Sequence, residues 1–208
     1  MARRAYRVLK RILDGVSAAA LLFVTFPLLV LASLCILLES GRPVFFRQKR
    51  VGRHGQVFTI YKLRTLHQRP HDLTAPGQHA TRVGTVLRRW ALDELPQLWN
   101  VLKGEMSLVG PRPTLPDQVA QYGPFERRRL DVRPGLTGWA QVNGRNALTW
   151  PERIRLDVWY VDNQSLGLDL RILLRTPGAL RSGEGVYGEG GRNEAFEVPE
   201  RSTESVAP

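Results

Sequence analysis

The strongest feature of the hydropathy pattern is a run of 23 uncharged residues, 16–38, between Asp14 and Glu39. At about 1.5 Å per helical residue this run would reach roughly 34 Å, which is enough to cross a hydrocarbon core of about 30 Å. The run stays apolar on every face of a helix, and it is longer than the apolar part of a cleaved signal peptide. The pattern therefore predicts a helix inserted in a membrane.

Basic residues on both sides of the run bear on how it is inserted. They are Arg3, Arg4, Arg7, Lys10 and Arg11 before it, and Arg42, Arg47, Lys49, Arg50 and Arg53 after it. The positive-inside tendency would place both flanks on the cytoplasmic side, which a straight span cannot do. Pro27 lies at the centre, where it would kink a helix. Two arrangements stay open: a helix broken at Pro27 that enters and leaves through one leaflet, and an ordinary kinked span.

Two short stretches rich in β-branched and aromatic residues follow the membrane segment, at 44–46 and 57–61. Gly52 and Gly55 separate them, and strand-forming residues around glycines favour a small hairpin. The next segment, residues 67–80, is polar and contains two prolines, so we expect a loop there.

Two helices are expected towards the end of the body. Thr149-Trp150-Pro151-Glu152 is a capping box with proline just inside the start, so one helix should begin there and run to about Val161. Another should cover about residues 168–180, with an interruption at Pro177-Gly178. We divide the chain into a basic segment with the membrane helix (1–41), a globular domain (42–181) and a flexible acidic tail (182–208).

Charge and cysteine content narrow the possible partners. The formal net charge is +11, and because two Arg and six Glu follow residue 181, residues 1–181 carry +15. A body this basic implies an anionic partner: nucleic acid, anionic lipid or a phosphorylated small molecule. The single cysteine, Cys35, excludes an intramolecular disulfide framework and a Cys-based zinc cluster. Charge alone leaves the choice of partner open.

Two adjacent carboxylates mark the densest region. Asp93 and Glu94 precede Pro96, which suits the first turn of a helix, and Gly104 is a natural stop. With Arg88 one turn earlier, such a pair could hold a divalent cation and phosphate, and a carboxylate can also attack phosphorus. The alternative is that acidic residues are simply favourable at a helix start.

Further cationic segments surround this region in the sequence. Arg112 stands between two prolines, either as a presented anion ligand or as an ordinary loop residue. Residues 133–145 alternate turn residues with polar side chains, as in a nucleotide-binding loop or a plain Gly-rich turn. Lys62 and Arg64 lie on one face of an expected strand, either facing a ligand or facing solvent.

Four motifs in order resemble those of the bacterial sugar transferases, the monotopic phosphoglycosyl transferases that act on polyprenyl phosphate. The motifs are Lys62-Leu63-Arg64-Thr65, Leu92-Asp93-Glu94-Leu95-Pro96-Gln97, Gly110-Pro111-Arg112-Pro113 and Arg133-Pro134-Gly135-Leu136-Thr137-Gly138-Trp139. The resemblance implies a helix-rich α/β fold with a re-entrant membrane helix broken at Pro27. A small catalytic domain with a short β-hairpin and interfacial amphipathic helices would rest on the membrane.

The resemblance also assigns roles to individual residues. Asp93 matches the nucleophile that takes the phosphosugar as a covalent intermediate, and Glu94 matches its acidic partner. Both are expected to assist Mg²⁺ binding. Together with the neighbouring clusters, the resemblance gives a set of substrate- or phosphate-binding residues: Lys62, Arg64, Arg88, Arg112, Arg133, Arg145 and Asp157. Ala91 departs from the family pattern, which usually has Ser just before the acidic pair.

The implied reaction transfers a sugar 1-phosphate from a nucleotide diphosphate sugar, usually a UDP-sugar, to undecaprenyl phosphate, and so initiates assembly of a lipid-linked glycan. The expected location is the cytoplasmic face of the bacterial inner membrane, in contact with its lipids. The sequence leaves open whether the protein forms a homodimer. Two other hypotheses are a membrane-tethered nucleic-acid-binding protein and a non-catalytic scaffold. The sequence contains no recognisable nucleic-acid reading motif, so we expect no nucleic acid among the partners.

Overall fold

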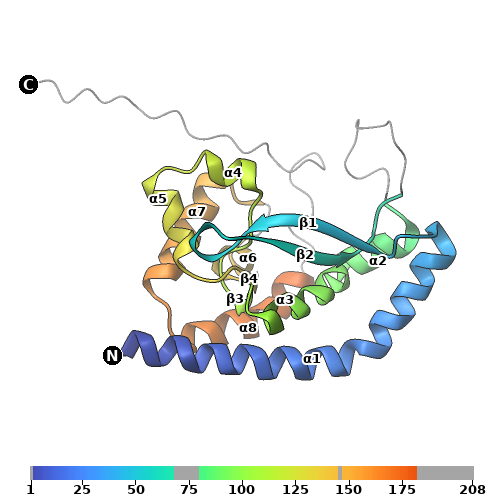
Figure 1. Cartoon of the computed structure of the whole chain (residues 1–208), viewed down its shortest axis with the longest axis horizontal. Coiled ribbons are helices and arrows are strands. Elements are labelled where there is room, and N and C mark those ends of the chain that lie inside the picture. The colour runs from blue at the N-terminus through green and yellow to red at the C-terminus, as the bar shows by residue number, and fades with distance from the viewer. Residues whose placement is uncertain (1, 68–79, 145–146, 182–208) are drawn as a thin grey trace, which may run out of the picture.

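A computed structural model describes residues 2–67, 80–144 and 147–181 of the chain (Figure 1). The polar loop at 68–79, Arg145 and the tail from 182 lie outside these residues. The described elements run in the order α1 (Ala2–Ser40), β1 (Phe45–Val51), η1 (Arg53–Gly55), β2 (Val57–Leu63), α2 (Arg82–Arg89), η2 (Leu92–Gln97), α3 (Leu98–Lys103), β3 (Ser107–Val109), α4 (Pro116–Ala120), α5 (Pro124–Arg127), η3 (Arg128–Asp131), β4 (Gly135–Thr137), α6 (Trp139–Val142), α7 (Trp150–Asp162) and α8 (Leu166–Arg181). Helices joined by two small sheets give a helix-rich α/β fold.

The long apolar run forms α1, a single helix of 39 residues. Pro27 lies inside it and the helix continues on both sides, so the expected break takes the form of a bend in a continuous helix. Figure 1 shows the ribbon of α1 running along the base of the molecule and then turning upward in its second half. Within the described residues, α1 is the one helix long and apolar enough to cross a membrane.

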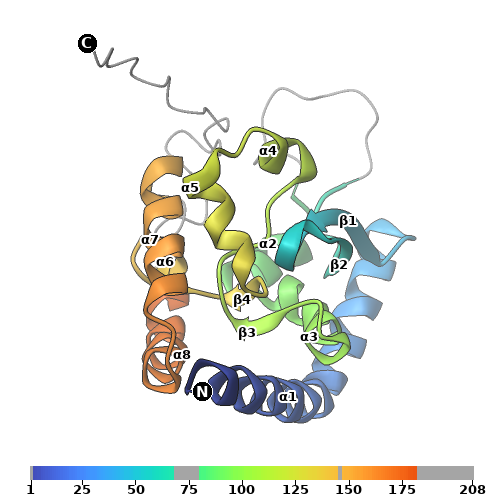
Figure 2. The ribbon, with the colours of Figure 1, turned by 60° about the vertical axis from the view of Figure 1, so that its left-hand side comes forward.

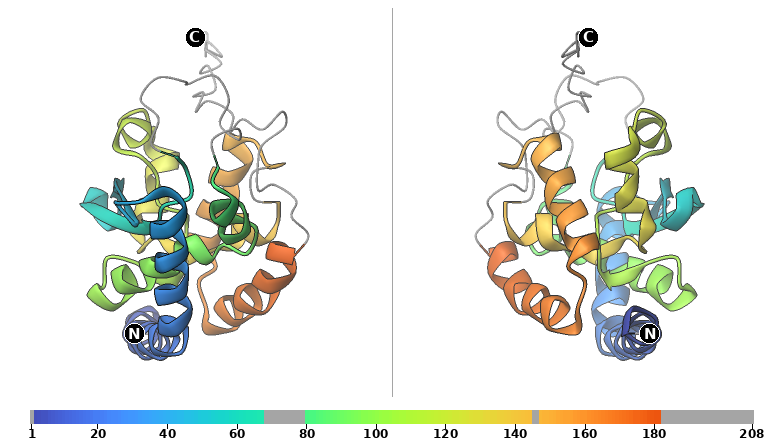
Figure 3. Two further views of the ribbon diagram at one scale, coloured as in Figure 1. Left: turned by 90° about the vertical axis from the view of Figure 1, so that its right-hand side faces the viewer. Right: turned by 90° about the vertical axis from the view of Figure 1, so that its left-hand side faces the viewer.

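Both ends of α1 pack against the same globular body. Near the start, Asp14 Oδ1 accepts a hydrogen bond from the backbone N–H of Leu108 at 3.1 Å, and Ala18 is fully buried. Near the end, Ile36 is fully buried in a cluster with Leu63 and Leu87. No other described element covers the opposite face of α1, as Figure 3 shows in its two views down the axis of the first half of the helix. The helix therefore lies along the body instead of projecting away from it.

The expected hairpin is confirmed. β1 and β2 pair antiparallel in a register that sets Phe45 opposite Leu63 and Val51 opposite Val57. In Figure 2 this hairpin lies beside α3, on the side of the molecule opposite α7. The hairpin thus brings Lys62, near the end of β2, close to the turn that carries the acidic pair.

The second sheet joins two of the sequence motifs. β3 and β4 are parallel, with Ser107 opposite Gly135 and Val109 opposite Thr137. The backbones approach so closely that a Cβ added to Gly135 would lie 2.1 Å from the amide nitrogen of Gly110. The glycines in segment 133–138 are explained by this contact, which brings that segment against the Gly110-Pro111-Arg112-Pro113 motif.

The two C-terminal helices partly match expectation. α7 begins after Thr149, whose backbone N–H donates to Glu152 Oε2 at 2.8 Å, as the capping box predicts. The prediction of an interruption at Pro177 is wrong, because α8 continues through this residue to Arg181. Only the last turn follows the proline, so the helix loses one backbone hydrogen bond near its end while buried Ile172 anchors it one turn earlier.

Candidate active site

The acidic pair is presented by an irregular turn between α2 and α3. Ala91 has a left-handed backbone with φ of 53°, an uncommon conformation for a residue with a Cβ. The chain then forms the 3₁₀ turn η2, which continues into α3 and ends at Gly104 with φ of 84°. Asp93 and Glu94 therefore lie in the first turn of this helical segment, as predicted. Strained backbone beside a candidate site is a common feature of functional sites.

Glu94 is fully engaged by two cations from different elements. Lys62 Nζ on β2 lies 2.6 Å from Glu94 Oε1, and the Arg112 guanidinium donates to both carboxylate oxygens at 2.5 and 3.1 Å. Burial alone would raise the pKa of Glu94, but Arg112 and Lys62 together hold it well below its ordinary value. Glu94 therefore stays ionised and links the hairpin to the loop after β3.

Asp93 differs from its neighbour in hydrogen bonding and in the direction of its pKa shift. Its exposed fraction is only 9 %, yet no donor among the described residues hydrogen-bonds its carboxylate. Burial and the adjacent Glu94 raise its pKa to about 6, while Lys62, Arg88 and Arg112 oppose the shift. A desolvated carboxylate with no hydrogen bonds keeps its lone pairs available, so it can act as a nucleophile or a metal ligand.

Arg88 reaches the site from the last turn of α2. Its Nε donates to Thr65 Oγ1 at 2.8 Å, and its charge acts on Asp93. The helix can lie this close to the strand end because of Gly84, where an added Cβ would be 2.2 Å from Thr65 O. The segments at 62–65 and 88–94 are therefore held together by backbone contact.

Arg112 is positioned by a buried pair behind it. The Arg129 guanidinium forms an ion pair with Asp157 on α7 and donates to Arg112 O at 3.0 Å. Arg129 also donates to Tyr122 Oη at 2.6 Å. Asp157, which the sequence suggested as a substrate contact, thus reaches the site only through Arg129 and the Arg112 backbone. Sequence reasoning missed Arg129, whose one signal is its place in an arginine run.

Arg50 on β1 is a further cation near the pair that the sequence placed only among flanking charges. Its Nη1 donates to Pro113 O at 3.1 Å, and burial followed by repulsion from Arg112 lowers its pKa to about 10. Its Nε is buried without a hydrogen-bond partner. In the sequence, Arg50 follows the polar residues Gln48 and Lys49, and this pattern does not predict that its side chain turns towards the site.

Two other predicted residues are described by the structure and are not brought to the acidic pair. Arg64 is buried beside the end of α1, where it donates to Ser40 O and Gly41 O at 2.7 Å each, so it ties the hairpin to α1. Arg133 donates through Nε to Gly104 O at 2.8 Å and lies near Arg11 and Arg53. Arg145 lies outside the described residues.

Comparison with known proteins identifies the family. A sequence model of the bacterial sugar transferases matches residues 5–183. The chain belongs to this family. An uncharacterized sugar transferase, EpsL of Bacillus subtilis (strain 168), is 46% identical over 182 residues, which cover 86% of this chain and 90% of that protein. The family match spans nearly all of α1 and the rest of the described chain of this bacterial sugar transferase.

Two further relatives have names that state a reaction. The UDP-glucose:undecaprenyl-phosphate glucose-1-phosphate transferase of Caulobacter vibrioides is 46% identical over 191 residues, covering 86% of this chain and 72% of the relative. The undecaprenyl-phosphate galactose phosphotransferase of Salmonella typhimurium is 35% identical over 207 residues, 90% of this chain and 43% of that longer protein. The bacterial sugar transferase described here is therefore similar to enzymes named for transfer to undecaprenyl phosphate.

Among the described residues, no group of three or more His, Cys, Asp or Glu side chains forms a ready-made metal site. The site instead has four cations, Lys62, Arg88, Arg112 and Arg50, around two carboxylates. With both carboxylates ionised the local charge is positive, and Arg112 is half exposed, so the site suits a ligand that brings negative charge of its own.

Proposed function

We propose that this bacterial sugar transferase moves a sugar 1-phosphate from a UDP-sugar to undecaprenyl phosphate through a covalent intermediate on Asp93. The observation that carries the proposal is the contrast within the acidic pair: Glu94 is bound by two cations, and Asp93 is buried with its carboxylate unbonded. Family membership and the names of the relatives support the reaction class. They do not favour a nucleic-acid-binding protein or a scaffold.

The chemistry proceeds in two displacements at phosphorus. An Asp93 oxygen attacks the phosphorus that bears the sugar, a bond from oxygen to phosphorus forms, and UMP leaves with the bridging oxygen and its electron pair. A phosphate oxygen of undecaprenyl phosphate then attacks the same phosphorus, and the Asp93 carboxylate leaves. Lys62, Arg88 and Arg112 offset the negative charge that gathers around both displacements.

Mg²⁺ is part of the proposal, and the residues present fit it. Mg²⁺ is commonly held by one or two carboxylates together with substrate phosphates, and Asp93 offers an unbonded carboxylate beside the cationic surface. Glu94 is less available because Lys62 and Arg112 occupy its oxygens. When bound, the ion would polarise the phosphoryl oxygens and stabilise the leaving UMP.

The test is a trapping experiment on the full-length chain in detergent micelles. UDP-glucose, UDP-galactose or UDP-N-acetylgalactosamine is added with Mg²⁺ and without acceptor. With the matching sugar we expect a burst of at most one UMP per chain and a rise in intact-protein mass equal to the sugar 1-phosphate less one water. Asp93→Asn should abolish both signals, and Asp117→Asn, at an exposed position on α4, should keep both. A burst that persists in Asp93→Asn would exclude Asp93 as the nucleophile.

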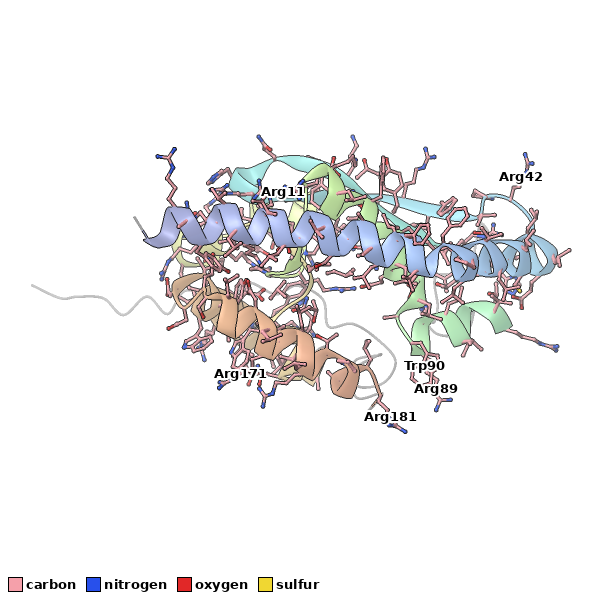
Figure 4. All side chains as sticks on the ribbon, turned by 90° about the horizontal axis from the view of Figure 1, so that it is seen from below. Arg11, Arg42, Arg89, Trp90, Arg171 and Arg181 are labelled. Atoms are coloured by element: carbon pink, nitrogen blue, oxygen red, sulfur yellow. The ribbon has the colours of Figure 1, made fainter. Side chains whose placement is uncertain are left out.

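The proposal places the catalytic body on the cytoplasmic face of the bacterial inner membrane, with α1 as a re-entrant helix. Its support is that one body holds both ends of α1, which a straight span across the bilayer would place on opposite sides. Seen from below, α1, α8 and α2 lie nearest the viewer (Figure 4). Exposed apolar residues gather on these three helices, as expected for elements that rest in the membrane interface: Phe23, Phe26, Val86, Trp90, Leu170 and Leu174.

The topology has its own test. After replacement of Cys35, single cysteines are introduced as Ala5→Cys and Arg42→Cys and labelled in whole cells with a membrane-impermeant maleimide. Both positions should be protected until the inner membrane is opened. Labelling of one position alone would mean that α1 crosses the bilayer.

A further inference from the structure

A second group of arginines lies away from the acidic pair, where α1 meets η1 and the segment before β4. Arg11, Arg53 and Arg133 each use part of the guanidinium on backbone carbonyls, which are those of Val101 and Leu102, of Asp131, and of Gly104 respectively. Burial, followed by repulsion from Arg11 and Arg53, lowers the pKa of Arg133. The three side chains therefore converge in spite of their like charge.

A small cavity lies at this convergence. Its volume is about 40 Å³, roughly three times what a single water molecule needs. Five cations and two carboxylates line it: Arg7, Lys10, Arg11, Arg53, Arg133, Asp14 and Asp131. Lys10 is balanced by Asp169 at 2.8 Å. The cavity therefore keeps an excess of positive charge, and it is large enough to admit the oxygen atoms of one phosphate group.

Donors remain free to bind such a group. The Nη atoms of Arg53 and Arg133 donate no hydrogen bond to any described residue, because each side chain uses only its Nε on the backbone. Convergent guanidinium N–H groups match the geometry of phosphate oxygens. Carbonyl contacts hold the guanidinium groups in place, so little side-chain entropy would be lost when an anion binds.

The cavity also lies at a defined depth relative to the membrane segment. Arg11 and Asp14 line it from α1, and the uncharged run begins at residue 16, about half a turn further along the helix. If that run is inserted, the cavity is at the level of the lipid headgroups.

We infer that Arg11, Arg53 and Arg133 form an anion site, separate from the acidic pair, that binds the phosphate group of an anionic lipid headgroup where α1 enters the membrane. The inference rests on the insertion of α1 and is independent of the chemistry proposed for Asp93. Inorganic phosphate offers the same chemical group without the lipid, so a binding test can distinguish the two sources.

The test measures thermal unfolding of the full-length protein in a neutral detergent. Short-chain phosphatidylglycerol, short-chain phosphatidylcholine and inorganic phosphate are titrated separately. A ligand that binds only the folded state raises the melting temperature in a saturable way. We expect this from phosphatidylglycerol and not from phosphatidylcholine. Arg53→Gln should weaken binding and so raise the half-maximal concentration by at least about tenfold, the scale of one charged hydrogen bond.

Matched variants separate a defined site from diffuse charge. Arg171→Gln removes one exposed arginine from α8 and should leave the half-maximal concentration within about twofold, since Arg171 does not line the cavity. Arg133→Lys keeps the charge while losing the planar guanidinium, and it serves if the loss of Arg53 prevents folding. Asp93→Asn should respond to phosphatidylglycerol as the parent does, and Arg53→Gln should release UMP at the parent rate.

Each outcome decides the inference. Stabilisation by phosphatidylglycerol alone supports a lipid headgroup as the source, and stabilisation by inorganic phosphate as well supports the site with free phosphate as a second source. The site is refuted by the absence of a saturable response to both anions. It is also refuted by equal weakening in Arg171→Gln and Arg53→Gln, which would show that the effect comes from overall charge.

Discussion

Two buried carboxylate clusters in this molecule are equally hidden from water and differ in how completely they are bonded. Asp169 on α8 is 7 % exposed and accepts hydrogen bonds from Tyr160 at 2.6 Å, Tyr6 at 2.9 Å and Lys10 at 2.8 Å. Asp93 on η2 is 9 % exposed and accepts none from the described residues. Burial alone therefore does not distinguish these two carboxylates, whereas the number of hydrogen-bond donors does.

The two clusters also contribute differently to stability. Around Asp169 two tyrosines and a lysine join α1 to α7 and α8, so the desolvation of the carboxylate is offset by charged hydrogen bonds. Around Asp93 the charges of Lys62, Arg88 and Arg112 offset the desolvation only in part and without hydrogen bonds from the described residues, which leaves a group that gains from a bound ligand. Hydrogen bonds thus stabilise the cluster where α1 packs against α7 and α8, and within the described part of the chain they are absent from the carboxylate for which chemistry is proposed.

The largest expected effect separates the clusters by activity. Asp93→Asn should lower UMP release by more than about 10³-fold, because an amide cannot form the covalent intermediate. Asp169→Asn should retain release to within about tenfold at a temperature where it stays folded. Steady-state rates of both variants in the same detergent check this contrast, and comparable losses in the two would show that the difference in bonding has no catalytic meaning.

The next effect reverses the order and concerns stability. Asp169→Asn leaves Lys10 without its counter-ion and weakens the contacts of Tyr6 and Tyr160, so we expect a loss of about 2–4 kcal/mol in the free energy of unfolding. Thermal or denaturant unfolding in detergent measures it. The double variant Lys10→Met with Asp169→Asn is the control and should recover part of the loss, since it removes the unpaired charge. No recovery would mean that Lys10 is stabilised by solvent instead.

The comparison also shows which parts of the molecule the sequence can predict. The apolar run, the hairpin glycines and the capping box at 149–152 are local signals, and they predicted α1, the β1–β2 hairpin and α7 correctly. The acidic pair was predicted at a helix start because Pro96 and Gly104 mark the segment locally. These features depend on residues within a few positions of each other.

The rest depends on contacts between distant segments. Lys62 lies on β2 and Arg64 follows directly after the strand, two residues later, yet Lys62 contacts Glu94 and Arg64 contacts the end of α1. Asp157 acts on the site through Arg129, which is 28 residues away in the chain, and no local pattern announces that pair. The bonding of Asp169 was likewise invisible, since its donors Tyr6 and Lys10 are more than 150 residues earlier.

A third effect tests the incomplete offset of the Asp93 desolvation directly. Its pKa of about 6 lies above the ordinary value, so the folded state binds the proton more tightly than the unfolded state does. Asp93 therefore lowers stability as the pH rises from about 4 to about 6, and this loss is complete above that range. Asp93→Asn should gain about 3 kcal/mol over the parent at pH 8 and little at pH 4. Unfolding curves of the two proteins at both pH values decide it, and a constant difference would contradict the raised pKa.

The smallest effect is the pH dependence of the chemistry itself. Only the ionised Asp93 can attack phosphorus, so the rate should fall about tenfold per pH unit below about 6, equivalent to about 1.4 kcal/mol per unit, and level off above it. The acceptor phosphate itself titrates near pH 6, so the measurement must be the first displacement alone, as the UMP burst rate without acceptor. Glu94→Gln is the sharper comparison. It removes the repulsive neighbour and releases Lys62 and Arg112 to stabilise the Asp93 carboxylate, so the midpoint should move to lower pH although the plateau rate falls. A midpoint that stays in place would mean that the group being titrated is not Asp93.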